Sequence, residues 1–330
     1  MKKFYKNKKI LITGGTGLIG IQLVNLLLGY EAKITVVSMD DKKNLPNNKN
    51  LKFFKLDLRD LKKTKKIFSG QDYVFHLAGI KGSPLMSLKN PYKFMIPMLM
   101  FNTNILEACR VSNVKRLLFT SSIGVYNQKG IMKESDVWNT FPSKNDWFAG
   151  WAKRIGELGV EALKINNKKI MTTIVRPANV FGPWDNFDSK TGMVIPSLIQ
   201  KFEKDKIGEI TVWGDGSNIR DFIYSKDVAK AMILVMYKSP KEPINLGCGS
   251  GISIKKLVNT INEIYSKPKK IIWDIKKIGG DKKRVLNISN LKNLGFGKFY
   301  DFKEALIETL EWYRKHKSLK INRYNAFNEK

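Results

Sequence analysis

A glycine-rich turn near the N-terminus constrains the fold of this chain more than any other feature. A short β-branched run at Ile10–Thr13 precedes the turn, and an apolar helical pattern at Ile19–Leu28 follows it. This order is the context of a dinucleotide-binding loop, although an ordinary strand-to-helix loop can also be rich in glycine. Glycines let the backbone approach a pyrophosphate, and N–H groups at the helix start point at the anion. We therefore predict cofactor contacts at Gly14, Thr16, Gly17, Leu18, Ile19 and Gly20.

The remainder of the first half alternates short apolar runs with helical patterns. The runs predict strands at Ile34–Ser38, Leu51–Leu56, Asp72–Leu77, Lys115–Thr120 and Met171–Arg176. The helical patterns predict helices at Leu61–Phe68, at Pro91–Val111 with an interruption near Pro97, and at Trp147–Ile165. Such alternation is typical of an α/β fold with a doubly wound parallel sheet of the Rossmann type.

The alternation loosens after residue 176. We predict helices at Met193–Phe202, Val228–Tyr237 (with Ser225 as its N-cap), Ile254–Tyr265 and Phe302–Lys315, and strands at Glu209–Trp213, Arg220–Tyr224 and Pro243–Leu246. This pattern predicts a Rossmann domain at 1–176 and, mainly, a smaller substrate-binding α/β lobe at 177–330, with 221–247 returning to the first domain. The polar tail from Ser318 is expected to fray.

The composition limits the classes of partner. The 330 residues carry a net charge of +30, but the lysines are scattered singly and in pairs, without an arginine-rich helix. We expect no nucleic-acid partner, although the basic field favours an anionic small substrate. Apolar runs stay shorter than the about 18 residues of a membrane-spanning helix, so we expect no membrane partner.

Cysteine and histidine are scarce in this chain. Cys109 and Cys248 give no disulfide framework and suit a reducing cytoplasm, which is the predicted location. The only histidines are His76 and His316. With so few soft ligands, we expect no metal site.

An acidic residue follows the second predicted strand. Asp40 lies about twenty residues beyond the glycine turn, where a carboxylate receives the ribose diol and selects NAD. Ser38 could instead stand at the strand tip, with Lys42 and Lys43 meeting the 2′-phosphate of NADP. We predict NAD and leave NADP open.

Eight motifs carry a resemblance that covers nearly the whole chain. They are, in order, GGTGLIG, DLRD, HLAG, TSSIGVY, GWAKRIGE, RPANVFGP, GDGSNIRDFIYSKDVA and GDKKR. In these motifs the chain resembles the extended short-chain dehydrogenase/reductases, which include the NAD-dependent epimerases and dehydratases of nucleotide sugars. FGPWDNF followed by MVIPSLIQKF is most similar to the GDP-fucose synthase branch. The resemblance implies a nicotinamide cofactor and a nucleotide-diphosphate sugar as partners.

The resemblance also implies roles for individual residues. In the family, a Tyr moves the proton of a sugar hydroxyl, and a Lys four residues later holds the ribose and lowers the pKa of that Tyr. Lys153 matches the Lys, and Ser121 and Ser122 match the serine that hydrogen-bonds the reacting oxygen. Further implied cofactor contacts are Asp57, Leu58, Leu77, Ala78, Gly79, Lys153, Pro177, Asn179 and Val180. Implied substrate contacts are Asn179, Arg220 and Arg284, whose guanidinium groups suit a diphosphate.

The main departure from the family pattern is Ala149, which stands at the Tyr position. Alanine has no titratable group and cannot act as an acid or base. Three explanations follow. A Tyr→Ala change was introduced to trap substrate; or the native branch uses another group, with Tyr126 first and Asp146, Ser121 or a bound water as others; or the protein binds its ligands without turning them over.

Two further departures narrow the reaction. Ile123 and Met193 occupy the positions of the Cys and His with which GDP-fucose synthases epimerise, so 3,5-epimerisation is not expected. The acidic dehydratase pattern after the fifth strand is also missing, which argues against 4,6-dehydration. We therefore predict an NAD(P)-dependent nucleotide-sugar oxidoreductase or epimerase that acts through a 4-keto sugar.

The alternative is a non-catalytic regulatory protein of the same fold that binds cofactor and sugar nucleotide. The helices at Pro91–Val111 and Trp147–Ile165 resemble the family's dimer-forming pair, so the resemblance also implies a homodimer.

Overall fold

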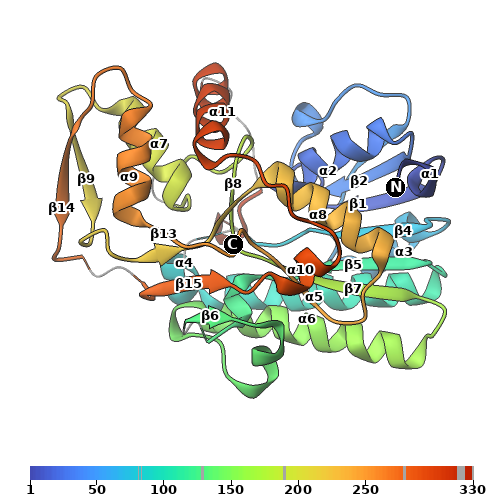
Figure 1. Ribbon diagram of the computed structural model, residues 1–330. Coiled ribbons are helices and arrows are strands. Elements are labelled where there is room, and N and C mark those ends of the chain that lie inside the picture. Colours follow the sequence, from blue (N-terminus) through green and yellow to red (C-terminus); the bar gives the residue numbers. More distant parts are fainter. Residues whose placement is uncertain are drawn as a thin grey trace.

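A seven-stranded parallel sheet organises the larger lobe (Figure 1). The computed structural model describes residues 1–80, 82, 84–127, 130–188, 191–277, 280–317 and 324–328. The strands of the sheet are β1 (Lys9–Thr13), β2 (Lys33–Ser38), β3 (Leu51–Lys55), β4 (Tyr73–His76), β5 (Arg116–Thr120), β7 (Met171–Pro177) and β12 (Ile244–Leu246). Their order is β12-β7-β5-β4-β1-β2-β3, so the winding direction reverses between β1 and β4. In open α/β sheets, ligands bind at such a reversal, beyond the carboxyl ends of the strands.

Helices cover both faces of this sheet. On one face, α2 (Leu18–Gly29) and α8 (Ser225–Lys238) pack together over Ile10 and Ile12 of β1. On the other face, α3 (Leu61–Phe68), α5 (Pro91–Val111) and α6 (Trp147–Asn166) cover Leu11. Because side chains alternate along a strand, every second residue of β1 serves one of the two cores. The predicted doubly wound Rossmann sheet is therefore confirmed.

The elements predicted for the first half begin and end within one residue of those observed, and one expectation about them is wrong. α5 runs without interruption from Pro91 to Val111, with Pro97 buried inside it. A proline removes its own N–H bond and strains the preceding turn. Here α5 lies between α3 and α6, and packing on both sides holds the helix together.

The second lobe is built from three small sheets and three long helices. β9 (Glu209–Trp213) pairs with β14 (Lys270–Asp274), and β8 (Asn179–Phe181) pairs with β11 (Phe222–Tyr224). A four-stranded sheet has the order β13 (Ile252–Ser253), β10 (Ile219–Arg220), β15 (Lys283–Leu286) and β6 (Ile131–Met132). The helices α7 (Val194–Lys204), α9 (Ile254–Glu263) and α11 (Phe302–His316) share a second core and lie to the left of α2 in Figure 1. The remaining helices are α1 (Lys2–Tyr5), α4 (Pro84–Lys89) and α10 (Ser289–Asn293).

A buried carboxylate divides the strand predicted at Arg220–Tyr224 into β10 and β11, which belong to different sheets. Asp221 is fully buried and accepts hydrogen bonds from the backbone N–H groups of Cys248 (2.9 Å), Gly249 (3.2 Å) and Leu286 (3.2 Å). Burial raises the pKa of Asp221 to about 6, while these N–H groups act in the opposite direction. The prediction of one continuous strand is wrong because Asp221 binds the turn after β12 and the end of β15 at this point.

Two further predictions are wrong, one about the start of a helix and one about the C-terminal tail. Ser225 is the first residue of α8 rather than its N-cap, and its buried Oγ has no hydrogen-bond partner within the described ranges. The tail does not simply fray: although 318–323 lie outside the described residues, Tyr324–Phe327 pack against the body of the protein, with Ala326 only 3% exposed. Apolar contacts made by Phe327 outweigh the polar composition of the tail.

The returning segment of the chain contributes both a strand and a helix to the larger lobe. β12 extends the large sheet beside β7, and α8 packs on α2. The predicted boundary between 176 and 177 stays a prediction. Within the described residues, no helix has the length and apolar character needed to cross a membrane.

Candidate active site

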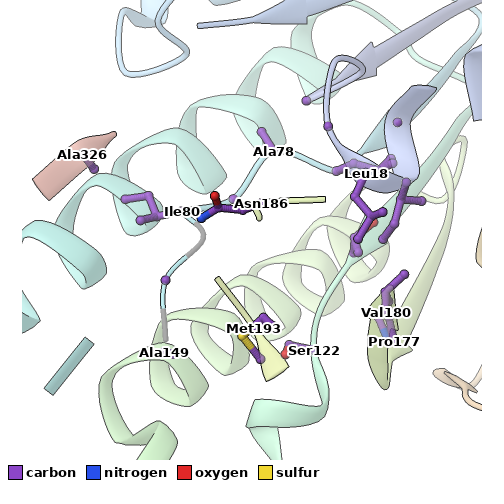
Figure 2. A pocket seen from close by; sticks show the side chains of 18 of the residues that line it. Leu18, Ala78, Ile80, Ser122, Ala149, Pro177, Val180, Asn186, Met193 and Ala326 are labelled. Carbon is purple, nitrogen blue, oxygen red and sulfur yellow. The ribbon is translucent and has the colours of Figure 1, made fainter. Parts of the chain in front are cut away.

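One cavity of about 860 Å³ lies beyond the carboxyl ends of β1, β2, β4, β5 and β7 (Figure 2). Figure 2 shows its lining from Leu18 on one side to Ile80 and Ala326 on the other. Most site residues predicted from the sequence meet there: Gly14, Thr16, Gly17, Leu18, Ile19, Gly20, Asp40, Asp57, Leu58, Leu77, Ala78, Gly79, Ser121, Ser122, Ala149, Lys153, Pro177, Asn179, Val180 and Arg284. Tyr126 and Arg220 do not line it.

The glycine turn has the geometry that a bound pyrophosphate requires. Gly14 has a φ of +70°, and a Cβ atom there would lie 2.9 Å from the backbone nitrogen of Ala78. A Cβ atom on Gly20 would lie 2.6 Å from the Cα of Gly15, so α2 starts directly against the turn. Ile21 is the first residue of α2 whose backbone N–H donates to a carbonyl of the preceding turn. The backbone N–H groups of 18–20 therefore point out of the N-terminus of the helix. The cradle fits the phosphates of a dinucleotide.

Asp40 is held at the end of β2 by three hydrogen bonds. Its Oδ2 accepts from Thr16 Oγ1 at 3.2 Å, and its Oδ1 accepts from the backbone N–H of Tyr324 at 2.7 Å. Its own N–H donates to Ser38 Oγ at 3.1 Å. Lys42 and Lys43 are exposed and lie outside the cavity lining. The carboxylate of Asp40, not a lysine, therefore faces this part of the cavity.

The two serines after β5 have different surroundings. Ser122 Oγ accepts from the N–H of Gly124 at 3.1 Å and caps the short 3₁₀ turn Ile123–Val125. Ser121 Oγ is buried and has no hydrogen-bond partner among the residues that the structure describes. An unpartnered buried hydroxyl in a cavity lining is suited to a ligand oxygen. Of the two serines, Ser121 therefore has the hydroxyl group better suited to contact a ligand.

Lys153 lies beside Ser121. Its Nζ donates to the backbone carbonyl of Thr120 at 2.8 Å. Burial lowers the pKa of Lys153 to about 8, and the nearby Glu157 carboxylate acts in the opposite direction. Ala149 lies one turn earlier on α6 and also lines the cavity (Figure 2). The side chain one turn before Lys153 on this helix is therefore a methyl group rather than a phenol.

Tyr126 does not supply the missing phenol, and this expectation is wrong. The 3₁₀ turn after Ser122 directs Tyr126 into the core, where it is fully buried. Its hydroxyl donates to Asn245 Oδ1 at 2.6 Å and accepts from Arg176 at 3.1 Å. Burial raises the pKa of Tyr126 above its usual value, although Arg176 opposes the shift. The side chain belongs to a buried polar network outside the cavity.

Two arginines meet at the substrate end, but only one faces the cavity. Arg220 and Arg284 are register partners on β10 and β15. Arg284 pairs with Asp146 Oδ2 at 2.8 Å, and its buried Nε has no hydrogen-bond partner within the described part of the chain. Arg220 donates to the carbonyls of Ile219 (2.9 Å) and Asp281 (2.6 Å). Burial and the charge of Arg284 lower the pKa of Arg220 to about 10.

Asn179 is oriented by the chain around Asp221. Both its backbone N–H and its side-chain amide donate to the carbonyl of Asp221, at 3.0 and 2.9 Å. Because the amide nitrogen is held in this way, the carbonyl end of Asn179 is the part left for a ligand.

The cavity also has lining residues that the sequence did not indicate. One group comes from α5 and the loop before α7: Phe94, Pro97, Phe101, Asn186, Asp188 and Thr191. Another comes from the tail: Tyr324, Asn325, Ala326 and Phe327. The FGPWDNF motif was a signal for the loop before α7, whereas nothing in the sequence of the polar tail indicated that it lines the cavity. The described residues hold no cluster of three or more His, Cys, Asp or Glu side chains that could bind a metal.

A family model described as the NAD dependent epimerase/dehydratase family matches residues 10–247. This chain belongs to that family. Membership confirms the predicted family and, because the family is NAD-dependent, the predicted class of cofactor. A probable GDP-L-fucose synthase 1 from Oryza sativa subsp. japonica is 28% identical over 317 residues, which cover 93% of this chain and 92% of the relative.

Solved structures of the epimerase/dehydratase family have the same fold. A UDP-N-acetylglucosamine 4-epimerase from Methanobrevibacter ruminantium M1, in complex with UDP-N-acetylmuramic acid, matches with a TM-score of 0.83 and 30% identity, covering 94% of this chain and 99% of that one. A GDP-L-fucose synthetase from Naegleria fowleri, bound to NADP, matches with a TM-score of 0.81 and 26% identity, covering 94% of each chain. The likeness extends over both lobes.

Proposed function

We propose that this protein is an NAD-dependent nucleotide-sugar oxidoreductase or epimerase that acts through a 4-keto sugar. One observation carries the proposal: a single cavity has the glycine turn and Asp40 at one end and Ser121, Lys153 and Arg284 at the other. The first group suits a dinucleotide, and the second suits a sugar attached to a diphosphate. The named relatives act on or bind ligands of this class.

The cofactor end favours NAD over NADP. The N–H groups at the start of α2 hold the pyrophosphate, and Asp40 accepts hydrogen bonds from the ribose diol. A 2′-phosphate would place a second negative charge against the Asp40 carboxylate. The bound nicotinamide accepts or donates a hydride, which supplies the redox chemistry.

The substrate end offers donors for a diphosphate. Arg284 lines the cavity, and its guanidinium group suits a phosphate oxygen. Arg220 lies beside it and raises the positive field without lining the cavity. The carbonyl end of Asn179 is available to a sugar hydroxyl.

Proton transfer falls to Lys153, since Ala149 places a methyl group where the family has a phenol. Oxidation at the sugar C4 removes a hydroxyl proton as well as a hydride, and a neutral amine can accept that proton. A lysine with a pKa of about 8 is partly neutral near pH 8, unlike an ordinary lysine. Ser121 lies next to the carbonyl that Lys153 contacts, so its hydroxyl can orient the reacting oxygen.

The second candidate, a non-catalytic binding protein, is favoured by one observation, the methyl group of Ala149. Hydride exchange with UDP-, GDP- and dTDP-sugars, measured for the present chain and for Ala149→Tyr, separates the two functions. A general acid or base contributes about 10²–10⁴-fold, so Ala149→Tyr is expected to raise the rate by that order. Ala149→Phe is the matched control, since it adds the ring without the hydroxyl.

Each outcome of this experiment has a definite meaning. Turnover by the present chain supports an enzyme whose proton carrier is a group other than residue 149. Turnover only after Ala149→Tyr means that the enzyme has lost its acid. If neither form reacts while NAD and a sugar nucleotide bind tightly, the protein is a binding protein.

A further inference from the structure

The C-terminal strap, defined as residues Tyr324–Phe327, forms part of the cavity wall although it is more than 300 residues from the glycine turn in sequence. Figure 2 shows Ala326 and Ile80 on the left of the view and Leu18 on the right. Ala326 is 3% exposed, so the strap is packed rather than loosely apposed.

The first anchor of the strap is the carboxylate expected to hold the adenosine ribose. The backbone N–H of Tyr324 donates to Asp40 Oδ1 at 2.7 Å, while Thr16 occupies one position on Oδ2. An ionised carboxylate offers about four lone-pair sites. Asp40 can therefore hold the strap and a ribose diol at the same time. The strap and the ribose are neighbours, not competitors.

The second anchor is aromatic. The Phe327 ring lies 6.1 Å from the Phe94 ring on α5, and its edge reaches within 3.1 Å of the point where Gly82 would carry a Cβ atom. Lys93 Nζ donates to the carbonyl of Phe327 at 3.3 Å. The side chain of Asn325 accepts the N–H of Phe327 at 3.0 Å and fixes the turn between the two anchors.

The strap lines the cavity without filling it, because the cavity retains about 860 Å³ with the strap in place. A segment placed to block the site would fill this space instead. We propose that the C-terminal strap is part of the dinucleotide site, where it covers the adenosine side and slows release of the cofactor. The proposal rests on the proposed function, since it takes the bound molecule to be NAD or NADH.

The test is the dissociation rate of NADH from the full-length protein, followed by the loss of nucleotide fluorescence after dilution. Tyr324→Pro removes the N–H that Asp40 accepts, and Tyr324→Ala keeps that N–H while removing the ring. Phe327→Ala removes the aromatic anchor. We expect Tyr324→Pro and Phe327→Ala each to speed release by about tenfold, since changes in a binding wall act mainly on release. Tyr324→Ala is expected to release NADH more slowly than Tyr324→Pro.

Thermal unfolding without cofactor shows whether each variant retains its fold, and Phe327→Ala tests the strap by itself should Tyr324→Pro not fold. Equal release rates for the present chain and both anchor variants would overturn the strap while leaving the proposed function intact. Slower release from the anchor variants would show that the strap obstructs the site, which also overturns the proposal. Failure of the present chain to bind any nicotinamide dinucleotide would overturn both.

Discussion

Two adjacent serines, Ser121 and Ser122, show how single residues with the same chemistry take different roles. The Ser122 hydroxyl is committed to the N–H of Gly124, whereas the Ser121 hydroxyl is buried, faces the cavity and is unpartnered within the described residues. The sequence motif could not separate them, because the distinction depends on which way the chain turns after β5.

Replacement of each serine by alanine separates these roles. Ser121→Ala is expected to lower kcat for the reacting sugar by about tenfold or more and to leave the melting temperature nearly unchanged, because only a ligand contact is lost. Ser122→Ala is the matched control. Loss of the cap is expected to lower the free energy of unfolding by about 0.5–2 kcal/mol and with it the melting temperature. Equal effects of both changes on kcat would contradict the assignment of Ser121.

His76 predicts a pH dependence of stability. Its ring is fully buried and forms hydrogen bonds with Thr13 (2.7 Å) and Asn102 (2.8 Å). Burial lowers the pKa of His76 to about 3. As the pH falls below 6.5, the unfolded chain gains a proton that the folded chain cannot bind, so stability is lost between pH 6.5 and 3. The loss approaches about 1.4 kcal/mol for each pH unit.

Urea unfolding between pH 7 and 5 measures this dependence. His76→Gln is expected to be less stable at pH 7 but to lose less stability on acidification than the present chain. Contributions from buried acids such as Asp221 are common to both proteins and cancel in the comparison. The same slope for both proteins would show that His76 is not the group responsible.

The site could be predicted wherever a residue follows a strand of the large sheet. Gly14, Asp40, Ala78, Ser121 and Asn179 all meet in one cavity, because parallel strands end at the same edge. The prediction for Tyr126 was wrong because the turn after Ser122 directs this side chain into the core. The strap was missed since no local pattern relates a polar tail to a distant carboxylate.

At the scale of elements, predictability depends on length and burial. β1 and β2 are continuous apolar runs buried on both faces, and α3 and α6 are amphipathic helices with one buried face, so their sequences indicate them. The second lobe uses strands as short as the two residues of β10, β13 and β6, which are too short to show any period. Their position depends on Asp221, whose three backbone contacts come from distant parts of the chain.

The outer face of α5 and α6 predicts an assembly. This face exposes apolar side chains, among them Tyr92 (73%), Leu158 (55%) and Ile165 (72%). Apolar helix faces of this kind mark protein interfaces. We propose that the protein is a homodimer that packs these helices against their copies.

A charge placed on this face tests the dimer. Leu158→Glu is expected to convert the dimer to a monomer, since burial of an unpaired carboxylate at an apolar interface is costly. Ile207→Glu is the matched control, because Ile207 is 80% exposed near the start of β9 in the other lobe. Light scattering coupled to gel filtration gives the mass of each variant. A monomeric starting protein, or dissociation by Ile207→Glu, would contradict the assignment.

At the scale of the whole molecule, residues from both lobes line the same cavity. The larger lobe supplies the glycine turn, Ser121 and Lys153, and the smaller lobe supplies Arg284. The chain as a whole carries a net charge of +30. Both proposed ligands, a dinucleotide and a nucleotide sugar, are anions that a positive charge attracts.

The most direct test of this account is a calorimetric titration of the purified protein with NADH and NADPH. We expect one NADH to bind to each chain, with a Kd on the order of micromolar or tighter, and NADPH to bind at least about tenfold more weakly because its 2′-phosphate would meet Asp40. Absence of binding by either nucleotide, in oxidised or reduced form, would contradict it.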